Sequence, residues 1–351
     1  MHKLLETFPD PAQALAASPA TLAAAGLSQA QITALRQCDE AAVERDLEWL
    51  SRPGRALIHW QDPRFPETLR RIAQPPLALF VHGDADLLAM PQIAIVGARH
   101  ASAQGIENAR AFAAELAARG FVVTSGLALG IDGAAHLGAL ETGYTVAVCG
   151  TGLDRVYPAR HQALAREIAQ RGALISEYPL GVAALAENFP RRNRLISGLS
   201  MGVLVVEAAR ESGSLISARY ALEQGREVFA IPGSIHNPMA RGCHALIRQG
   251  AKLVETVDDI FEEIGPLLGT RHASQEAGGV DRAHAPAQQD PASAIEREVL
   301  DALSDAPVVF DQLAERVRCP VDELQAVLTA LELDGRIAMT AAGGYQRLVR
   351  S

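Results

Sequence analysis

The chain has 351 residues, of which 48% are hydrophobic and 21% are charged, and this length predicts two or three domains. It has no apolar run long enough to cross a bilayer and no apolar signal-peptide core, so we expect a cytoplasmic protein without a membrane partner. Its four cysteines form no CxxC pair, which argues against a zinc site or a disulfide framework. Its two lysines, Lys3 and Lys252, lie outside any GxxxxGK[ST] motif, which excludes a P-loop ATPase and makes a pyridoxal phosphate site improbable.

The formal net charge of −9 is unevenly distributed along the chain. Residues 1–50 and residues 291–351 each carry −4, whereas the residues between them carry −1. Because acidic ends repel a polyanion, a nucleic acid has to bind a local patch in the middle of the chain.

Residues 1–70 predict a helical domain of the SAM or helix-hairpin-helix type. The segment PATLAAAGLSQAQITALRQ predicts two helices joined by a tight Ala-Gly turn, with Ser28 capping the second helix. Such a hairpin can touch a DNA backbone, but its surroundings here are acidic, which favours a structural or partner-docking role. Residues 51–75 are punctuated by prolines and predict a connector that lies on the next domain.

Residues 75–269 predict an α/β domain of the Rossmann-like, doubly wound kind. Short and nearly continuous apolar runs alternate with helical patterns, which is typical of a parallel sheet covered on both faces. A short strand and a helix close the domain after Lys252. The predicted strands are IAIVG, FVVTSG, TVAVCG, ALISEY, VLVVEA and EVFAIPG, and helices are predicted near Gln104–Arg119, Asp132–Thr142 and Ser214–Gln224.

Residues 270–292 are rich in Ala, Gly, Gln and Pro and predict a flexible linker. Residues 293–351 predict a winged-helix-like domain, with three helices (Ile295–Leu303, Phe310–Val317 and Val321–Leu333) and a hairpin whose turn region holds Gly343 and Gly344. The third helix would enter a major groove, but it carries acids and no Lys or Arg. We therefore expect this domain to contact protein or regulate rather than read duplex DNA.

Five loops at predicted strand ends combine glycine with Ser, Thr or Arg. In an open parallel sheet such loops meet at one edge, where helix N-termini attract anions. NAD is a poor fit, because no strict GxGxxG follows the first strand and no acidic residue ends the second. The loops therefore predict a site for a different phosphate-bearing ligand. They are residues 96–102, 124–132, 149–154, 207–214 and 231–234.

The stretch ENFPRRNRLISGLS places three arginines, Arg191, Arg192 and Arg194, around Asn193, directly before a predicted apolar helix. Arginine matches phosphate oxygens with a planar, permanently charged fork, although a solvated charge run is the usual role of such a triplet. Phe189 beside it offers a ring on which a base can stack. The triplet therefore predicts a nucleic-acid contact.

Two groups of residues contain the side-chain types found in catalytic sites, but neither group supports an enzymatic function. Ser125, Asp132 and His136 have the residue types of a triad, but Asp132 and His136 lie one helical turn apart and are expected to pair with each other or to cap the helix. Cys243 and His244 are neighbours in sequence, and such side chains diverge on a helix. We therefore expect no catalytic residues, and no cofactor or metal.

The central domain resembles the DNA-processing protein A (DprA, or Smf) family. The resemblance runs in order through IAIVGARHASAQG, VVTSGLALGIDGAAHLGAL, TVAVCGTGLDRVYP and LISEYPLG, and continues to GCHALIRQGAKLV. It implies a non-enzymatic protein that binds single-stranded DNA, protects incoming DNA and loads the RecA recombinase on it during natural transformation. It also implies a homodimer built through the Rossmann-like domain.

The resemblance also implies which residues contact the DNA. Two positions depart from common family choices, Ala98 and His244, and both concern local loop geometry rather than the arginines. The implied contact residues are Gly97, Arg99, Ser125, Gly126, Phe189, Arg191, Arg192, Asn193 and Arg194, with Ser212, Gly213 and Ser214 as phosphate ligands at a helix start.

A second hypothesis is a nucleotide-cleaving enzyme related to the phosphoribohydrolases that share this topology. Such an enzyme needs a PGGxGTxxE-type loop with a catalytic Glu. The comparable stretch here is EAARESGSLISARYALEQG, which has neither the paired glycines nor that spacing of the Glu.

Overall fold

The computed structural model describes residues 7–8, 11–37 and 39–265, and toward the C-terminus residues 299, 302–303, 308–317, 324–325, 327–328, 331, 337–339 and 344–347. The chain divides into two compact units, Met1–Ala277 and Gly278–Ser351. The linker predicted over residues 270–292 lies outside the described residues. No helix among these residues has the length and apolar character needed to cross a membrane.

The first unit begins with short helices, as the sequence predicts. Ser28 caps α4, and the capping box is complete because the Ser28 side chain accepts from the Gln31 amide while the Gln31 side chain accepts from the Ser28 amide. Leu22 and Ile32 are buried in a small core of their own. The helices are α2 (Pro11–Ala16), α3 (Pro19–Ala24), α4 (Gln29–Arg36) and α5 (Glu40–Leu50).

A nine-stranded sheet forms the centre of the first unit, with strand order β1-β2-β6-β5-β4-β3-β7-β8-β9. All pairs from β6 to β9 are parallel, so the doubly wound prediction is confirmed. The strands are β1 (Arg55–His59), β2 (Ala78–Gly83), β3 (Gln92–Val96), β4 (Val122–Ser125), β5 (Thr145–Val148), β6 (Ala173–Ser176), β7 (Gly202–Val205), β8 (Glu227–Ala230) and β9 (Lys252–Leu253).

The sheet also has two antiparallel strands that the sequence analysis missed. β1 pairs with β2, and β2 pairs with β6, both antiparallel. The prediction of a simple connector over residues 51–75 is therefore wrong, because Arg55–His59 is an edge strand and Glu67–Arg70 is a short helix, α6. The strand was not predicted because prolines follow it closely in the sequence and its five residues show only a short apolar alternation.

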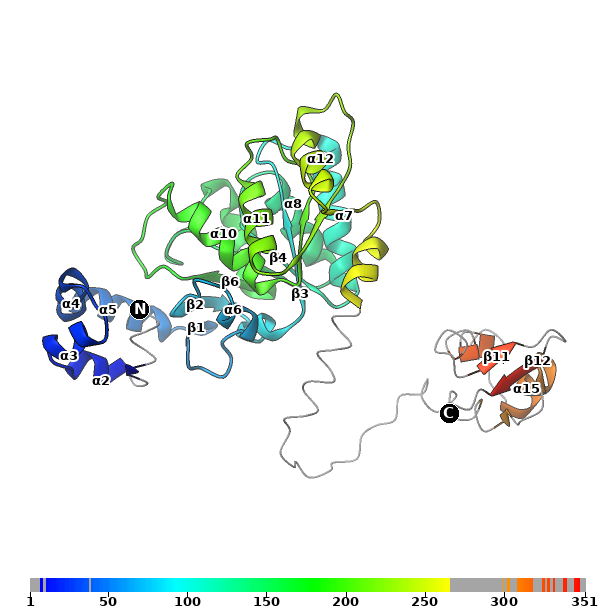
Figure 1. Ribbon diagram of the computed structural model, residues 1–351, viewed down its shortest axis with the longest axis horizontal. Coiled ribbons are helices and arrows are strands. Elements are labelled where there is room, and N and C mark those ends of the chain that lie inside the picture. The colour runs from blue at the N-terminus through cyan, green and yellow to red at the C-terminus, as the bar shows by residue number, and fades with distance from the viewer. Residues whose placement is uncertain are drawn as a thin grey trace. The chain divides into compact units, whose positions relative to one another are not determined.

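Helices cover both faces of the sheet (Figure 1). Alternate residues of β3 point to opposite faces, so Ala94 and Val96 join one core and Ile93 and Ile95 the other. One face packs against α6, α10 (Asn188–Leu199), α11 (Ser214–Glu223) and α12 (Arg241–Arg248), and the other against α7 (Ala103–Ala118), α8 (Ile131–Thr142) and the helical residues 257–265. A further helix, α9 (Gln162–Arg171), packs against β5 and β6.

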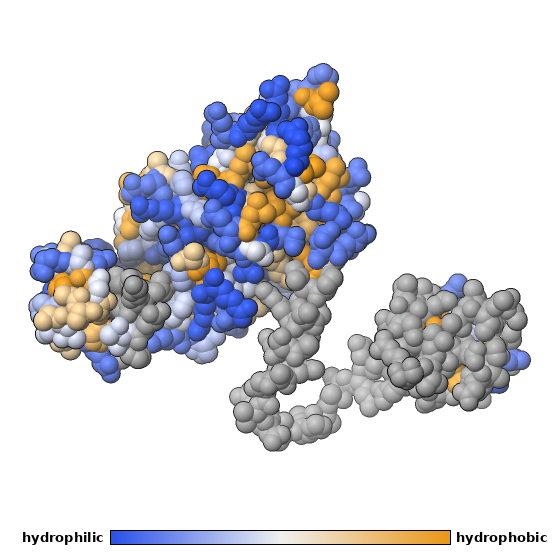
Figure 2. Space-filling model, in the orientation of Figure 1, coloured by the Kyte–Doolittle hydropathy of each residue, from blue (hydrophilic) through white to orange (hydrophobic). Residues whose placement is uncertain are grey.

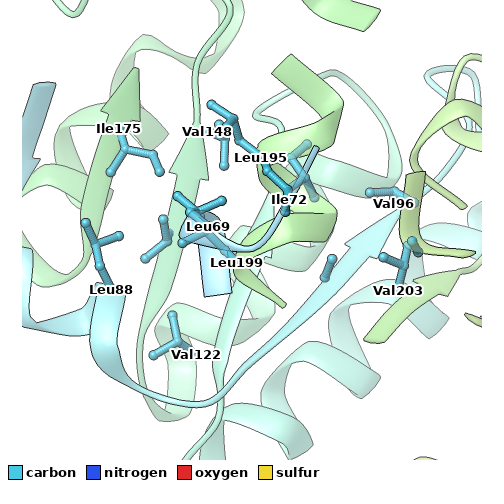
Figure 3. Packing of buried hydrophobic residues seen from close by; sticks show 14 of the residues in the cluster. Leu69, Ile72, Leu88, Val96, Val122, Val148, Ile175, Leu195, Leu199 and Val203 are labelled. Atoms are coloured by element: carbon cyan, nitrogen blue, oxygen red, sulfur yellow. The ribbon is translucent and has the colours of Figure 1, made fainter. Parts of the chain in front are cut away.

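The core between the sheet and α10 explains why the α6 segment belongs to this domain. Leu69 and Ile72 lie against Leu195 and Leu199 of α10, over strand residues such as Val122 (Figure 3). Adding a Cβ at Gly198 would bring it to 2.8 Å from Leu69, so the small residue permits this close packing.

The predicted helices α7, α8 and α11 are confirmed within one residue at each end. The arginine triplet is placed differently from the prediction. It lies inside α10, which begins at Asn188, and not in a loop before the helix. Successive residues of a helix point about 100° apart, so the three arginines face different surroundings.

The second unit has a three-stranded sheet and at least one full helix among its described residues. The predicted helix Phe310–Val317 is confirmed as α15, and the predicted hairpin pairing is confirmed, with β11 (Ile337–Met339) antiparallel to β12 (Gly344–Arg347). Gly344, predicted in the turn region, is the first residue of β12, and Gly343 lies outside the described residues. β10 (Val308–Val309) adds to β12. Residues 299 and 302 in the predicted first helix, and residues 324–325, 327–328 and 331 in the predicted third helix, are helical; the other residues of these segments, apart from Leu303, lie outside the described part.

Candidate nucleic-acid interface

A cleft of about 620 Å³ opens at the carboxyl edge of the parallel strands. β3 lies where the strand order changes direction, with β4 on one side and β7 on the other. The loops after β3 and β7 diverge at such a point, which is where ligands bind in open α/β sheets. The lining includes Gly97, Arg99, His100, Asp132, Tyr157, Phe189, Arg192, Asn193, Glu211, Ser212, Gly213, Ser214 and Met239.

Arg192 forms part of the cleft lining and is only 4% exposed. One terminal nitrogen donates to the Val148 carbonyl, while its Nε has no hydrogen-bond partner among the described residues. None of the ion pairs formed by the described residues involves Arg192. A buried guanidinium that forms no ion pair is costly, so an anion in the cleft would complete its surroundings.

Asp132, at the start of α8, is the acidic neighbour of Arg192. Its Oδ2 accepts from the amides of Gly126 at 3.2 Å and Ala128 at 3.4 Å. Burial raises the pKa of Asp132, and the nearby Arg192 opposes that rise. Gly126 lies between the two charged groups, since an added Cβ would overlap the Arg192 guanidinium and lie 2.7 Å from Asp132 Oδ2. Gly126 therefore supports the floor and lines only a smaller adjoining hollow of about 50 Å³.

An aromatic pair, Phe189 and Tyr157, forms one wall of the cleft. Their ring centroids lie 5.2 Å apart with an interplanar angle of 39°. The Arg99 guanidinium lies 5.9 Å from the Phe189 centroid, within the range of a cation–π contact. Tyr157 is 48% exposed and was missed in the sequence analysis, although it follows the predicted strand-end loop CGTGLD. Together the rings offer a surface on which bases can stack.

The start of α11 forms the opposite wall. Ser212, Gly213 and Ser214 all line the cleft, and the hydroxyls of the two serines lie 2.7 Å apart. Asn193 on α10 donates to the Gly213 carbonyl at 3.4 Å and ties the two helices together. The first turn of a helix presents backbone amides and a positive dipole, which suit a phosphate.

The structure brings together eight of the twelve predicted site residues as lining of this cleft. Gly126 lies beneath it, and three others lie elsewhere. Ser125 is fully buried in β4, where its hydroxyl donates to the Ile95 carbonyl at 2.6 Å. Arg191 is exposed on α10, outside the lining.

Arg194 is held away from the cleft. Its two terminal nitrogens donate to both carboxylate oxygens of Glu177 at 2.6 Å, and its Nε donates to the Gln74 carbonyl at 2.9 Å. Both partners are largely buried, with side chains 11% and 17% exposed. This bidentate pair satisfies the Arg194 guanidinium within the protein.

The residue types of a triad do not assemble. Asp132 and His136 neither pair with each other nor cap α8, the two alternatives that the sequence predicts. Asp132 accepts from the loop amides described above, and His136 Nδ1 bonds to Thr145 Oγ1 at 2.6 Å. Burial lowers the pKa of His136 to about 3, so its ring is neutral near pH 7. Cys243 and His244 diverge as expected, toward the Val205 and Gly233 carbonyls respectively. No cluster of potential metal ligands occurs in the described part of the chain.

Comparison with known proteins identifies the family. The family model for DNA recombination-mediator protein A matches residues 56–265, and the model for the DprA winged helix domain matches residues 283–343. The chain belongs to the DprA/Smf family. Protein Smf of Escherichia coli (strain K12) is 45% identical over 328 residues, which cover 93% of this chain and 86% of that protein. The terminal domain is accordingly a winged helix, as predicted.

Two solved structures of the family agree with the fold described above. The structure of DNA processing protein A from Streptococcus pneumoniae is similar with a TM-score of 0.66 and 37% identity, covering 74% of this chain and 91% of that one. The structure from Helicobacter pylori, described in terms of a single-stranded DNA binding mode, has a TM-score of 0.54 and 32% identity, covering 59% and 94%. The Rossmann-like prediction is therefore confirmed.

Proposed function

We propose that this chain binds single-stranded DNA in the cleft. Phosphates of the strand lie near Arg99, Arg192 and the start of α11, and its bases lie against Phe189 and Tyr157. The observation that carries the proposal is the buried Arg192 guanidinium, which lines the cleft without a carboxylate partner among the described residues. A phosphate supplies the missing charge.

The aromatic wall supports a single strand over a duplex. In a duplex the faces of the bases are stacked on one another, whereas an unpaired strand offers them to aromatic side chains. The winged helix does not favour a duplex either, because its third predicted helix carries Asp322, Glu323 and Glu332, is followed by Asp334, and has no basic residue. We propose a protein-contact or regulatory role for that domain.

Within this proposal the protein is a recombination mediator and not an enzyme. It protects incoming single-stranded DNA, passes it to the RecA recombinase in natural transformation, and acts as a homodimer joined through the Rossmann-like domain. Membership of a family described as DNA recombination mediators supports this role. The Helicobacter pylori relative, whose structure is described in terms of a single-stranded DNA binding mode, supports single-stranded DNA as the ligand.

The proposal is tested by fluorescence anisotropy with a labelled oligo-dT and a matching duplex, each titrated with salt. We expect tight binding to the single strand, little binding to the duplex, and a salt slope of about −0.7 for each phosphate contacted. Absence of single-strand binding at low salt would overturn the proposal. Hydrolysis of a nucleoside monophosphate would then support the phosphoribohydrolase hypothesis.

A further inference from the structure

Glu207 lies directly behind the cleft and takes no part in its lining. It follows strand β7, is 8% exposed, and lies between the loop after β3 and the loop after β8. None of the ion pairs of the described residues includes it. Its carboxylate is instead bound entirely by neutral donors, which points to a precise local task.

That task concerns the loop that carries Arg99. At one end of the loop the Ala98 amide donates to the Glu207 main-chain carbonyl at 2.7 Å. At the other end Ser102 donates twice to the Glu207 carboxylate, through its amide at 2.8 Å and through its hydroxyl at 2.6 Å. A single residue thus fixes both ends of the arch whose middle residues are Arg99, His100 and Ala101.

The carboxylate has little freedom to move. Asn237 donates to Glu207 Oε1 at 3.3 Å from the loop after β8. A Cβ added to Gly105 would lie 2.5 Å from the Glu207 carboxyl carbon, so the first turn of α7 closes over the group. Ser102 caps that turn by accepting from the Gly105 amide at 3.0 Å, and a negative charge is favourable at this end of a helix.

The chemistry requires a carboxylate and not an amide. Both Glu207 oxygens accept, one from the Ser102 amide and the other from the Ser102 hydroxyl and Asn237. A glutamine has the same shape, but its NH₂ group would face a donor on one side. The arch would then shift, and Arg99 would leave its place beside Phe189.

We infer that Glu207 is a positioning residue that holds Arg99 where it can bind a phosphate of the DNA. The inference rests on the proposed single-stranded DNA binding. It predicts that removing the Glu207 charge weakens DNA binding. Net charge alone predicts the opposite, because an acidic protein that loses a negative charge should bind a polyanion more strongly.

The test compares E207Q with E223Q in the full chain, by anisotropy with labelled oligo-dT. Glu223 lies on α11 with its side chain 59% exposed, so E223Q removes the same charge without touching the arch. We expect E207Q to weaken binding about tenfold, as for a lost charge-assisted hydrogen bond, and to reduce the salt slope by about 0.7. E223Q should bind as well as the native protein or slightly better.

A double-mutant cycle with R99A links the effect to Arg99. R99A/E207Q should bind no more weakly than R99A alone, whereas the effects of R192A and E207Q should multiply. If E207Q binds like E223Q, or if the E207Q and R99A losses multiply, the inference is overturned. Failure of the native protein to bind the single strand would instead overturn the proposed function.

A milder variant covers the case in which E207Q does not fold, as judged by thermal melting. S102A removes the hydroxyl that donates to the carboxylate and caps α7, and it keeps the main-chain contacts, so its thermal melting is compared with that of the native protein as well. We expect a loss of about threefold in affinity, smaller than for E207Q because the Ser102 amide keeps its bond to the carboxylate. The loss should again disappear in the R99A background, and a loss that persists there would contradict the inference.

Discussion

Arginines meet opposite surroundings at the cleft and on the flank of the sheet near α6. At the cleft, Arg192 is 4% exposed and no ion pair of the described residues includes it. On the α6 flank, Arg194 binds both oxygens of Glu177 at 2.6 Å. Arg70, on the same flank, donates to the Asp62 carbonyl at 3.0 Å and lies 3.7 Å from a Glu67 oxygen.

The difference separates two uses of one residue type. On the flank, carboxylates of the protein pair with the arginines, and Arg194 of α10 also binds the α6 segment through the Gln74 carbonyl. In the cleft, Arg192 lies near Asp132 without forming an ion pair, and on the proposed function this leaves its guanidinium to bind a phosphate. Figure 2 shows one face of this unit, where hydrophilic residues border apolar surface between α11 and α12. A count of arginines along the chain cannot make this distinction, because it depends on which carboxylates the fold brings near.

The largest effect is expected for Arg192→Ala. Loss of a buried, charged donor should weaken binding to oligo-dT by about 100-fold, or about 3 kcal/mol. The loss should be similar for different sequences, because phosphates carry no sequence information. Anisotropy at one low salt concentration measures it, with R166A as a control that removes an exposed arginine on α9. Equal affinities of R192A and R166A would contradict the cleft assignment.

Acid should destabilise the cleft region through His136. Burial lowers the pKa of His136 to about 3, with His161 and Arg192 as further causes, whereas the unfolded side chain titrates near its ordinary value of 6.5. The unfolded state therefore binds a proton first, and stability is lost as the pH falls from about 6.5 toward 3. Between about pH 6 and about pH 4 the loss should reach about 2.5 kcal/mol.

Urea unfolding of the native protein and of H136N across this range measures the effect. The variant should lose less stability with falling pH, because its side chain does not titrate. Identical pH dependence in the two proteins would show that His136 does not control acid stability.

Arg194→Ala should act on the flank alone. Breaking a largely buried bidentate pair leaves Glu177 without its partner and should lower the free energy of unfolding by about 2 kcal/mol. E177Q should show a similar loss in urea unfolding. A normal free energy of unfolding combined with weakened DNA binding would mean that Arg194 serves the ligand instead, as the sequence had suggested.

Phe189→Ala tests the uncharged part of the cleft. One lost stacking contact should weaken binding about tenfold, or about 1.4 kcal/mol, within the range for base–aromatic stacking. The salt slope should not change, because no charge is lost. F189L keeps an apolar side chain without the aromatic face and should show most of the same loss. A changed slope would indicate that the ring acts mainly by placing Arg99.

The sequence predicts much of the fold because the parallel strands are apolar on both faces and the helices α7, α8 and α11 have clear patterns. The sequence does not predict β1, because this strand forms by pairing with β2 and its own proline-rich segment has no clear strand pattern. For the candidate site, the glycine loops and the arginine triplet indicate the carboxyl edge of the parallel strands, where the cleft opens. Which arginine lines the cleft depends on the helical placement of the triplet, because α10 directs Arg192 into the cleft and Arg194 toward Glu177.

Tyr157 and Glu207 show two further limits. Tyr157 acquires its role only when its loop folds back onto Phe189 of α10. Glu207 receives donors from residues 105 positions earlier and 30 positions later in the chain, a distance that no local pattern records. Glu207 lies within a predicted strand-end loop and Tyr157 lies three residues after another, so the pattern indicates the region without the contacts.

The most direct test of the account is the salt dependence of oligo-dT binding for the native protein, R192A and R194A. We expect the slope of log K against log salt concentration to become less negative by about 0.7 in R192A and to stay at the native value in R194A. A native slope in R192A together with a reduced slope in R194A would contradict the claim that the cleft, and not the α6 flank, binds the phosphates.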